Sequence, residues 1–190
     1  RLEAAHTRIV RPAACVVQVL HGSVMDRSID YGLYMTSSRR IETIRSLTGE
    51  FAGSAGLAAV AIGSGIAAQT LSPGDVGLQL FENAFATALG LGVLIAVFAP
   101  VSGAHFNPVV TLVDALLHGR PVQSVATYLP VQILGCITGA VVANLMFGLP
   151  AVSWATTDRA SWPTLFAEVV ATAGLLTVIF GLVRTGRSHL

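Results

Sequence analysis

Charged residues are scarce in this sequence. Only 11% of its 190 residues are Asp, Glu, Lys or Arg, whereas 53% are hydrophobic, and the mean hydropathy is strongly positive. This composition excludes an ordinary soluble domain and favours an integral membrane protein, with the lipid bilayer as its surroundings. The net charge of +1 argues against a nucleic-acid-binding role.

Cysteines and catalytic patterns are also scarce. Cys15 and Cys136 lie far apart, and Cys136 falls within an apolar stretch, so we expect neither a disulfide framework nor a metal site. The sequence has no glycine-rich phosphate loop, no metal-spaced set of ligands and no Ser–His–Asp arrangement. We therefore predict that the protein is not an enzyme and has no cofactor.

Long apolar runs dominate the chain from residue 51 onward. Phe51–Leu71 and Val122–Phe147 contain no charged residue. These runs match the roughly 20 residues that a membrane-spanning helix needs. The sequence predicts an all-α, polytopic membrane helical bundle with four spans, at about 51–71, 79–99, 122–147 and 164–183.

Residues 1–45 are different, because they hold seven of the eleven arginines and only short apolar runs. We expect a basic, poorly ordered cytoplasmic extension; a basic anchor lying on the membrane surface is the alternative. Basic residues also favour the cytoplasmic side of a membrane. The N-terminus, the loop between the second and third spans and the C-terminus are therefore assigned to the cytoplasm, from Arg39, Arg40, Arg45, His118, Arg120, Arg184 and Arg187.

A polar stretch, Ser-Gly-Ala-His-Phe-Asn-Pro-Val-Val-Thr-Leu, begins at Ser102. Asn107 followed by Pro108 is typical of a helix start, because Asn caps free N–H groups and Pro fits the first helical position. Irregular backbone at membrane depth is tolerated only inside protein or beside a water-filled cavity. We predict a re-entrant loop and half-helix at 102–117. Asn107 would donate to a solute, and the lumen would be lined by the backbone of Gly103, Ala104, His105 and Phe106.

These eleven residues resemble the first Asn-Pro-Ala half-helix of the aquaporin and glycerol-facilitator channels, the major intrinsic proteins. Val109 stands where the family usually has Ala. The resemblance covers residues from about 46 to 190 and implies an aquaporin-like membrane domain with an incomplete second repeat. It also implies passive diffusion of a small neutral solute, a homotetramer, and a place in a bacterial inner (plasma) membrane.

An internal repeat supports this resemblance. The segment from Glu50 to Leu57 aligns with the segment from Glu168 to Leu175, with Glu, Ala, Gly and Leu in common. An odd number of spans between them gives inverted topology. Carboxylates at membrane depth are costly, and we expect both glutamates to be buried. The resemblance implies that each hydrogen-bonds the backbone of a pore loop; a proton relay is the alternative.

Thr87 is a candidate residue for the selectivity of the pore. In the resembled family, the residue of the second span twenty places before the motif Asn helps to form the narrowest part of the pore, and here that residue is Thr87. Water-selective members usually carry Phe there, and glycerol channels carry an aromatic residue. A small hydroxylated side chain favours glycerol, urea or neutral metalloid hydroxides over water alone.

Two alternatives stay open at this point. The chain could be a truncated, non-conducting membrane subunit or remnant that associates with full-length channels. It could also be a secondary transporter with inverted repeats. Such a transporter needs an ion site within the membrane, and Glu50 and Glu168 are the candidates that the sequence offers for it.

Overall fold

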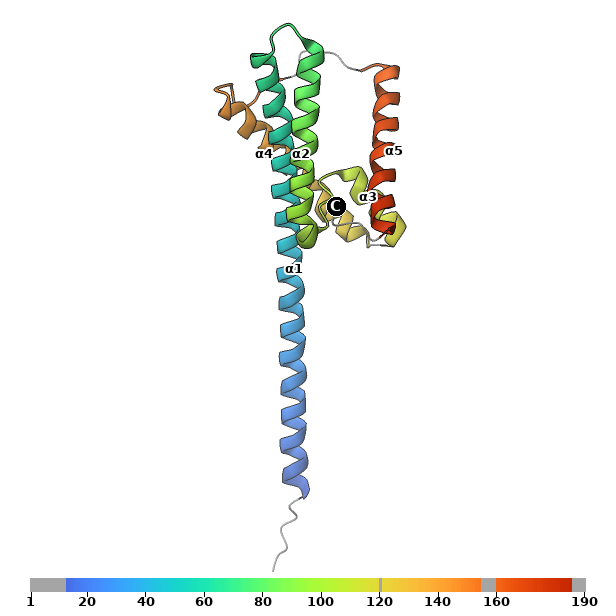
Figure 1. Ribbon diagram of the computed structural model, residues 1–190. Coiled ribbons are helices and arrows are strands. Elements are labelled where there is room, and N and C mark those ends of the chain that lie inside the picture. The colour runs from blue at the N-terminus through green and yellow to red at the C-terminus, as the bar shows by residue number, and fades with distance from the viewer. Residues whose placement is uncertain (1–12, 120, 155–159, 186–190) are drawn as a thin grey trace, which may run out of the picture. The chain divides into compact units, whose positions relative to one another are not determined.

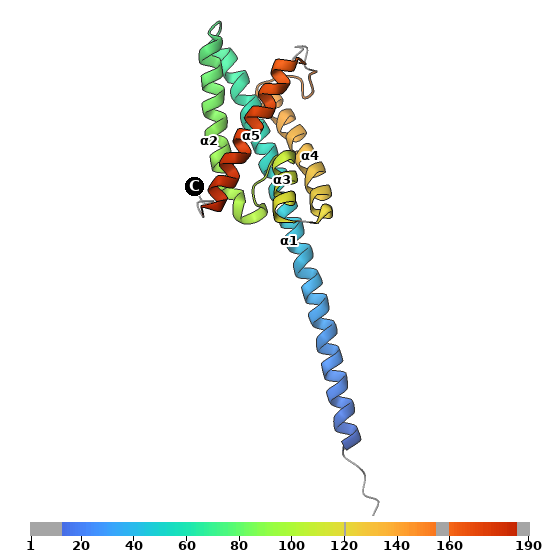
Figure 2. The same ribbon diagram turned by 90° about the vertical axis from the view of Figure 1, so that its right-hand side faces the viewer.

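The structure is a computed structural model, which describes residues 13–119, 121–154 and 160–185, with side chains described from residue 38 onward. These residues form helices throughout, joined by short turns and loops (Figures 1 and 2). The helices are α1 (Ala13–Leu71), α2 (Val76–Ser102), α3 (Pro108–His118), α4 (Val122–Met146) and α5 (Trp162–Arg184).

The chain divides into two compact units, residues 1–44 and 45–190. In the first unit, the chain is helical from Ala13 onward, and the poor order expected for the N-terminal extension stays a prediction. The sequence there contains no proline after Pro12 that would interrupt a helix. Residues 1–12 of that extension lie outside the described residues.

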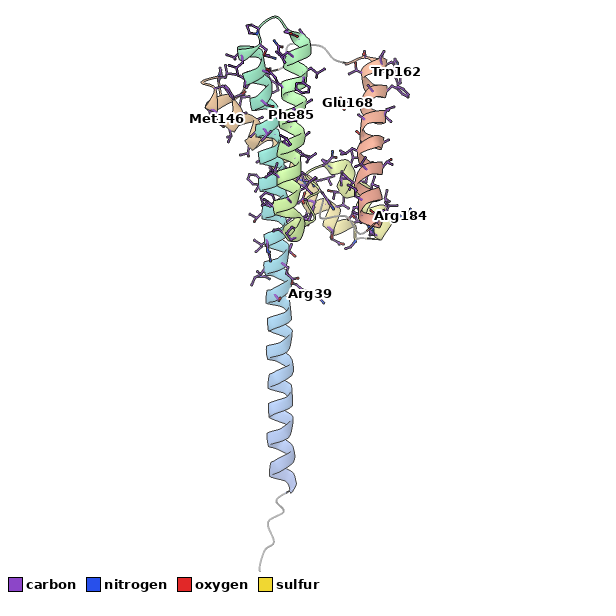
Figure 3. The ribbon with its side chains drawn as sticks, viewed as in Figure 1. Arg39, Phe85, Met146, Trp162, Glu168 and Arg184 are labelled. Carbon is purple, nitrogen blue, oxygen red and sulfur yellow. The ribbon has the colours of Figure 1, made fainter. Side chains whose placement is uncertain are left out.

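Within the described part of the chain, four helices are long and apolar enough to cross a membrane, which confirms the predicted all-α membrane fold and its four spans. They comprise Ser38–Leu71 of α1 together with α2, α4 and α5. Large apolar side chains on these helices face outward, among them Phe85, Met146 and Trp162 (Figure 3). Outward apolar surface of this kind is suited to lipid rather than to water.

Capping explains why α2 is longer at both ends than the predicted 79–99. The Asp75 side chain accepts a hydrogen bond from the Leu78 backbone N–H at 2.9 Å and so starts the helix at Val76. At the other end Gly103 takes a left-handed conformation with φ of 91°, and its N–H donates to the Ala99 carbonyl. Pro100 lies inside the last turn without ending the helix.

Small residues bring α1 and α4 into backbone contact. Gly135, Gly139 and Ala143 are buried at four-residue intervals along α4. A Cβ atom on Gly139 would lie 2.1 Å from the Ala55 carbonyl oxygen, and one on Gly135 would lie 2.6 Å from the Phe51 carbonyl oxygen. Close approach through small residues is a usual way to pack helices in membranes.

We predict that Gly139→Ala destabilises the protein by roughly 1–3 kcal/mol, because the added methyl group must push α1 and α4 apart. Thermal unfolding in detergent measures the effect. Gly174→Ala on α5 is the matched control, since nothing lies within 4 Å of its added Cβ. Equal melting temperatures for the two variants would contradict this packing.

Candidate functional site

The loop between α2 and α3 has an unusual backbone. Gly103, Ala104 and Phe106 all have positive φ, at 91°, 51° and 47°. For a residue with a side chain, this left-handed conformation costs about 1–2 kcal/mol. The loop therefore needs outside contacts to keep its shape.

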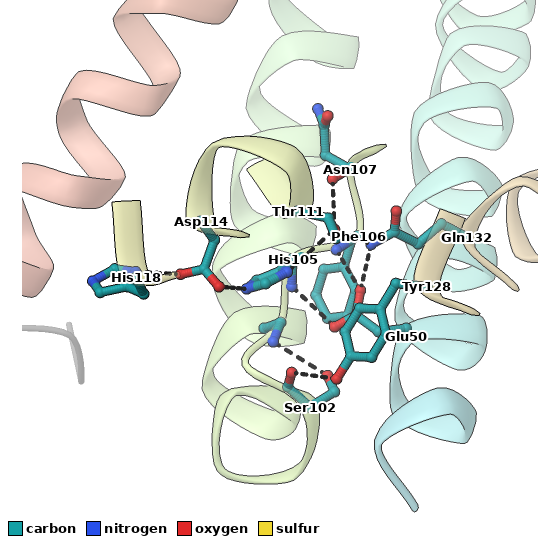
Figure 4. Close-up of polar contacts among 11 residues, drawn as sticks. Glu50, Ser102, His105, Phe106, Asn107, Thr111, Asp114, His118, Tyr128 and Gln132 are labelled. Carbon is teal, nitrogen blue, oxygen red and sulfur yellow. Dashed lines mark hydrogen bonds and ion pairs between the residues drawn. The ribbon is translucent and has the colours of Figure 1, made fainter. Parts of the chain in front are cut away.

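The Glu50 carboxylate on α1 supplies the main contacts. Its Oε1 accepts a hydrogen bond from the His105 N–H at 3.0 Å, and its Oε2 accepts one from the Phe106 N–H at 2.8 Å (Figure 4). Glu50 is completely buried, as expected from the sequence. Charge-assisted bonds to buried donors are among the stronger hydrogen bonds in proteins. The carboxylate thus fixes two consecutive peptide groups of the loop.

Gln132 on α4 completes this arrangement, although it was not predicted from the sequence. Its Nε2 donates to Glu50 Oε2 and to Thr111 Oγ1, both at 2.8 Å. Gln132 is also fully buried. The sequence did contain a sign of its role, because Gln132 is a polar residue in the middle of a span that has no charged residue. Gln132 links the Glu50 carboxylate to the half-helix α3.

The Phe106 ring anchors the loop on its apolar side. The ring is 3% exposed and packs edge-on against Phe98, with ring centroids 5.9 Å apart. It occupies the space in which Gly53 has no side chain, because a Cβ there would lie 1.9 Å from the ring. Gly53 lies on α1 one turn after Glu50, and its lack of a side chain leaves the space that the Phe106 ring fills.

Asn107 starts α3 as predicted from the sequence. Its Oδ1 accepts hydrogen bonds from the N–H groups of Val109 at 2.8 Å and Val110 at 3.4 Å, and Pro108 fills the first turn. Its Nδ2 makes no hydrogen bond within the described part of the chain. Figure 4 shows the side chain on the side of the loop away from Glu50. Capping thus fixes the oxygen and leaves the amide N–H groups available.

The loop also offers acceptors. Among the described residues, no hydrogen-bond donor reaches the carbonyl oxygens of Gly103, Ala104 and Phe106. The N-terminus of α3 adds a partial positive charge beside them. The carbonyl oxygens of the loop and the Asn107 amide are neutral acceptors and donors, which suit a neutral hydroxylated molecule better than a cation.

Further polar contacts tie the loop to the far end of α3. His105 Nδ1 lies 3.2 Å from Thr111 Oγ1, and its Nε2 lies 3.6 Å from Asp114 Oδ2. Asp114 in turn contacts His118 Nδ1 at 2.9 Å. On the other side, the Tyr128 hydroxyl donates to the Ser102 carbonyl at 3.1 Å. These contacts hold the loop from α3 and α4 as well as from α1.

Two predicted site residues lie apart from this cluster. Thr87 is in the middle of α2, where its hydroxyl donates to Asn83 Oδ1 at 3.0 Å. Glu168 lies on α5 (Figure 3) and is exposed among the described residues, so its burial against a pore loop stays a prediction. No part of the described chain covers that face of α5, which has no buried residue.

The described residues place a short helix after an irregular loop among four candidate membrane-spanning helices, and comparison with known proteins gives the family. The family model "Major intrinsic protein" matches residues 37–190. The chain belongs to the major intrinsic protein family, which consists of channels and not of enzymes. No solved structure matches this chain.

Curated relatives agree with this family. The chain is 36% identical over 149 residues to "Aquaglyceroporin AqpS" of Rhizobium meliloti, covering 78% of this chain and 64% of that protein. It is 32% identical over 114 residues to the "Glycerol uptake facilitator protein" of Bacillus subtilis, covering 53% and 40%. It is 33% identical over 111 residues to "Probable aquaporin NIP7-1" of Arabidopsis thaliana, covering 57% and 39%. The chain thus spans less than two thirds of each of these relatives.

We predict that Glu50→Gln loosens the loop. The amide has a single acceptor oxygen, and its NH₂ group would face another N–H, so one buried donor loses its partner at about 1–3 kcal/mol. Hydrogen–deuterium exchange should be faster in the loop peptide that contains His105 and Phe106. Glu42→Gln is the control, because Glu42 is exposed. Unchanged exchange in Glu50→Gln would contradict the holding role of the carboxylate.

A second prediction concerns the packing of the Phe106 ring against Gly53. Gly53→Ala should lower the melting temperature, because its methyl group needs the space that the ring occupies. Phe106→Leu in the same chain should restore part of the loss, since the smaller side chain leaves room. If the two single losses simply add in the double variant, the two residues do not share this space.

Proposed function

We propose that this chain forms part of a channel for passive, facilitated diffusion of small uncharged solutes such as water, glycerol, urea or neutral metalloid hydroxides. The observation that carries the proposal is the loop held by Glu50. Among the described residues, the carbonyls of Gly103, Ala104 and Phe106 find no donor, and the Asn107 amide N–H groups beside them find no acceptor. A solute that loses its water shell there meets replacement donors and acceptors. Exclusion of ions follows from the cost of removing water from a charge.

The site residues take distinct roles in this proposal. Asn107 orients the solute through its Nδ2 donors, and Gly103, Ala104, His105 and Phe106 provide backbone acceptors. Pro108 and Val109 fix the start of the half-helix; Val109 is exposed by 43%. Thr87 contributes to the constriction, and Glu50 supports the loop. Glu168 would support the corresponding loop of a second repeat.

Orientation and assembly are part of the same proposal. We place the N-terminus, the loop between α2 and α4 and the C-terminus on the cytoplasmic side of a bacterial inner membrane, because the arginines gather in these segments. Arg120 and Arg187, on which this assignment partly depends, lie outside the described residues. A homotetramer follows from the family resemblance.

The test separates capping from solute contact at Asn107. Asn107→Asp keeps a good helix cap, because Asp and Asn are equivalent at that position, but it replaces the N–H donors by a carboxylate oxygen. We expect a folded protein whose glycerol and water permeabilities fall by about tenfold or more, the factor that corresponds to roughly 1.4 kcal/mol. Stopped-flow light scattering of proteoliposomes containing the natural protein with this sequence measures both.

Thr138→Val on the exposed face of α4 is the control and should conduct normally. Full permeability in Asn107→Asp would contradict the proposed donor role. If the unmodified protein raises neither water nor glycerol permeability, the proposed function fails, and the non-conducting subunit becomes the better interpretation.

A further inference from the structure

Three ionisable side chains form a row from the loop to the end of α3 (Figure 4). The carboxylate in the middle, Asp114, is buried. Its Oδ1 lies 2.9 Å from Nδ1 of the exposed His118, and its Oδ2 lies 3.6 Å from Nε2 of the buried His105. A buried carboxylate is costly without donors or a positive charge beside it. Both neighbours of Asp114 can gain a proton, since histidines change charge between about pH 5 and 8.

The other edge of the His105 ring faces a hydroxyl group that can turn. His105 Nδ1 lies 3.2 Å from Thr111 Oγ1, and the same oxygen lies 3.1 Å from the Asn107 carbonyl oxygen. A hydroxyl group has one proton and two lone pairs. Gln132 Nε2 donates to one lone pair of Thr111 at 2.8 Å. One proton and one lone pair of Thr111 therefore remain for His105 and Asn107.

These contacts fit two protonation states of the His105 ring. In the neutral ring with its proton on Nε2, Nδ1 accepts the Thr111 proton, and the N–H faces Asp114. In the protonated ring, Nδ1–H donates to the remaining lone pair of Thr111, whose own proton turns to the Asn107 carbonyl. The ring thus takes a proton without losing a partner, and its new charge faces a carboxylate. The Nε2–Oδ2 distance of 3.6 Å is too long for a hydrogen bond, so the charge can shorten it.

We propose that His105 and Asp114 form a pH-sensitive switch that tightens the loop as the surroundings become acidic. Contacts between a protonated ring and a carboxylate are about twice as strong as neutral hydrogen bonds. Because His105 belongs to the loop and Asp114 to α3, the stronger contact holds the two together. This stabilisation is present at acidic pH and is lost as the pH rises and the ring gives up its proton.

Other titratable groups also surround this pair. On α1, the Glu50 carboxylate accepts the His105 backbone N–H. On α4, the Tyr128 ring centroid lies 5.8 Å from that of His105. On α3, His118 contacts the second oxygen of Asp114. The test must therefore separate His105 from Glu50 and from His118.

Hydrogen–deuterium exchange of the loop peptide with His105 and Phe106 measures the switch in the natural protein that contains this sequence, reconstituted in lipid. After correction for the intrinsic pH dependence of exchange, we expect about threefold greater protection at about pH 5.5 than at about pH 8, the order of one hydrogen bond. Nitrogen-15 NMR should show protons on both ring nitrogens of His105 at the lower pH and on one at the higher. Equal protection at the two pH values would overturn the proposal.

Three variants assign the effect. Asp114→Asn keeps the shape of the side chain and removes its charge, so the difference in protection should disappear. His105→Gln covers the case in which Asp114→Asn does not fold, because it keeps the backbone N–H for Glu50 and cannot titrate; it should also remove the difference. His118→Gln is the control and should keep it, since His118 is exposed and contacts the other carboxylate oxygen.

A pH effect that persists in His105→Gln would belong to another group, such as Glu50, and would overturn the proposal. Loss of the effect in His118→Gln would overturn it too, because His118 would then be the group that titrates. Permeability is not measured in this test, so its outcome is separate from that of the proposed function.

Discussion

The pairing of one buried carboxylate with two backbone N–H groups is the interaction on which the rest of the site depends. The loop before α3 contains two non-glycine residues with positive φ, Ala104 and Phe106, and such a backbone does not persist without support. Glu50 gives that support directly, and Gln132 extends it to α3. With the loop fixed, the first turn of α3 has a defined place, and the Asn107 amide with it.

Glycines determine where this carboxylate can lie. Gly53 leaves space for the Phe106 ring, and Gly135 and Gly139 let α4 approach α1 closely enough for Gln132 to reach Glu50. Burying a polar cluster is less costly where its donors and acceptors find partners, as the Glu50 carboxylate does. Packing and hydrogen bonding therefore depend on each other here. A side chain added at Gly139 would separate the helices that carry Glu50 and Gln132.

Features set by local chemistry were predictable from the sequence. The existence of four apolar spans follows from composition, and the start of α3 follows from the Asn107–Pro108 pair, so both were predicted correctly. Gln132 and Gly53 were missed, because their partners lie 82 and 53 residues away in the sequence, and only the packing of helices shows which faces meet. Glu168 looked equivalent to Glu50, but burial depends on what covers a helix face, and the sequence pattern cannot show that.

The most direct test of the central claim is an experimental structure, in lipid, of the natural protein that contains this sequence, at a resolution that shows ordered water. We expect the Glu50 carboxylate to accept hydrogen bonds from the His105 and Phe106 N–H groups. We also expect a water molecule or solute within hydrogen-bonding distance of Asn107 Nδ2. A Glu50 side chain turned away from the loop, or an Asn107 amide sealed by protein groups, would contradict the account.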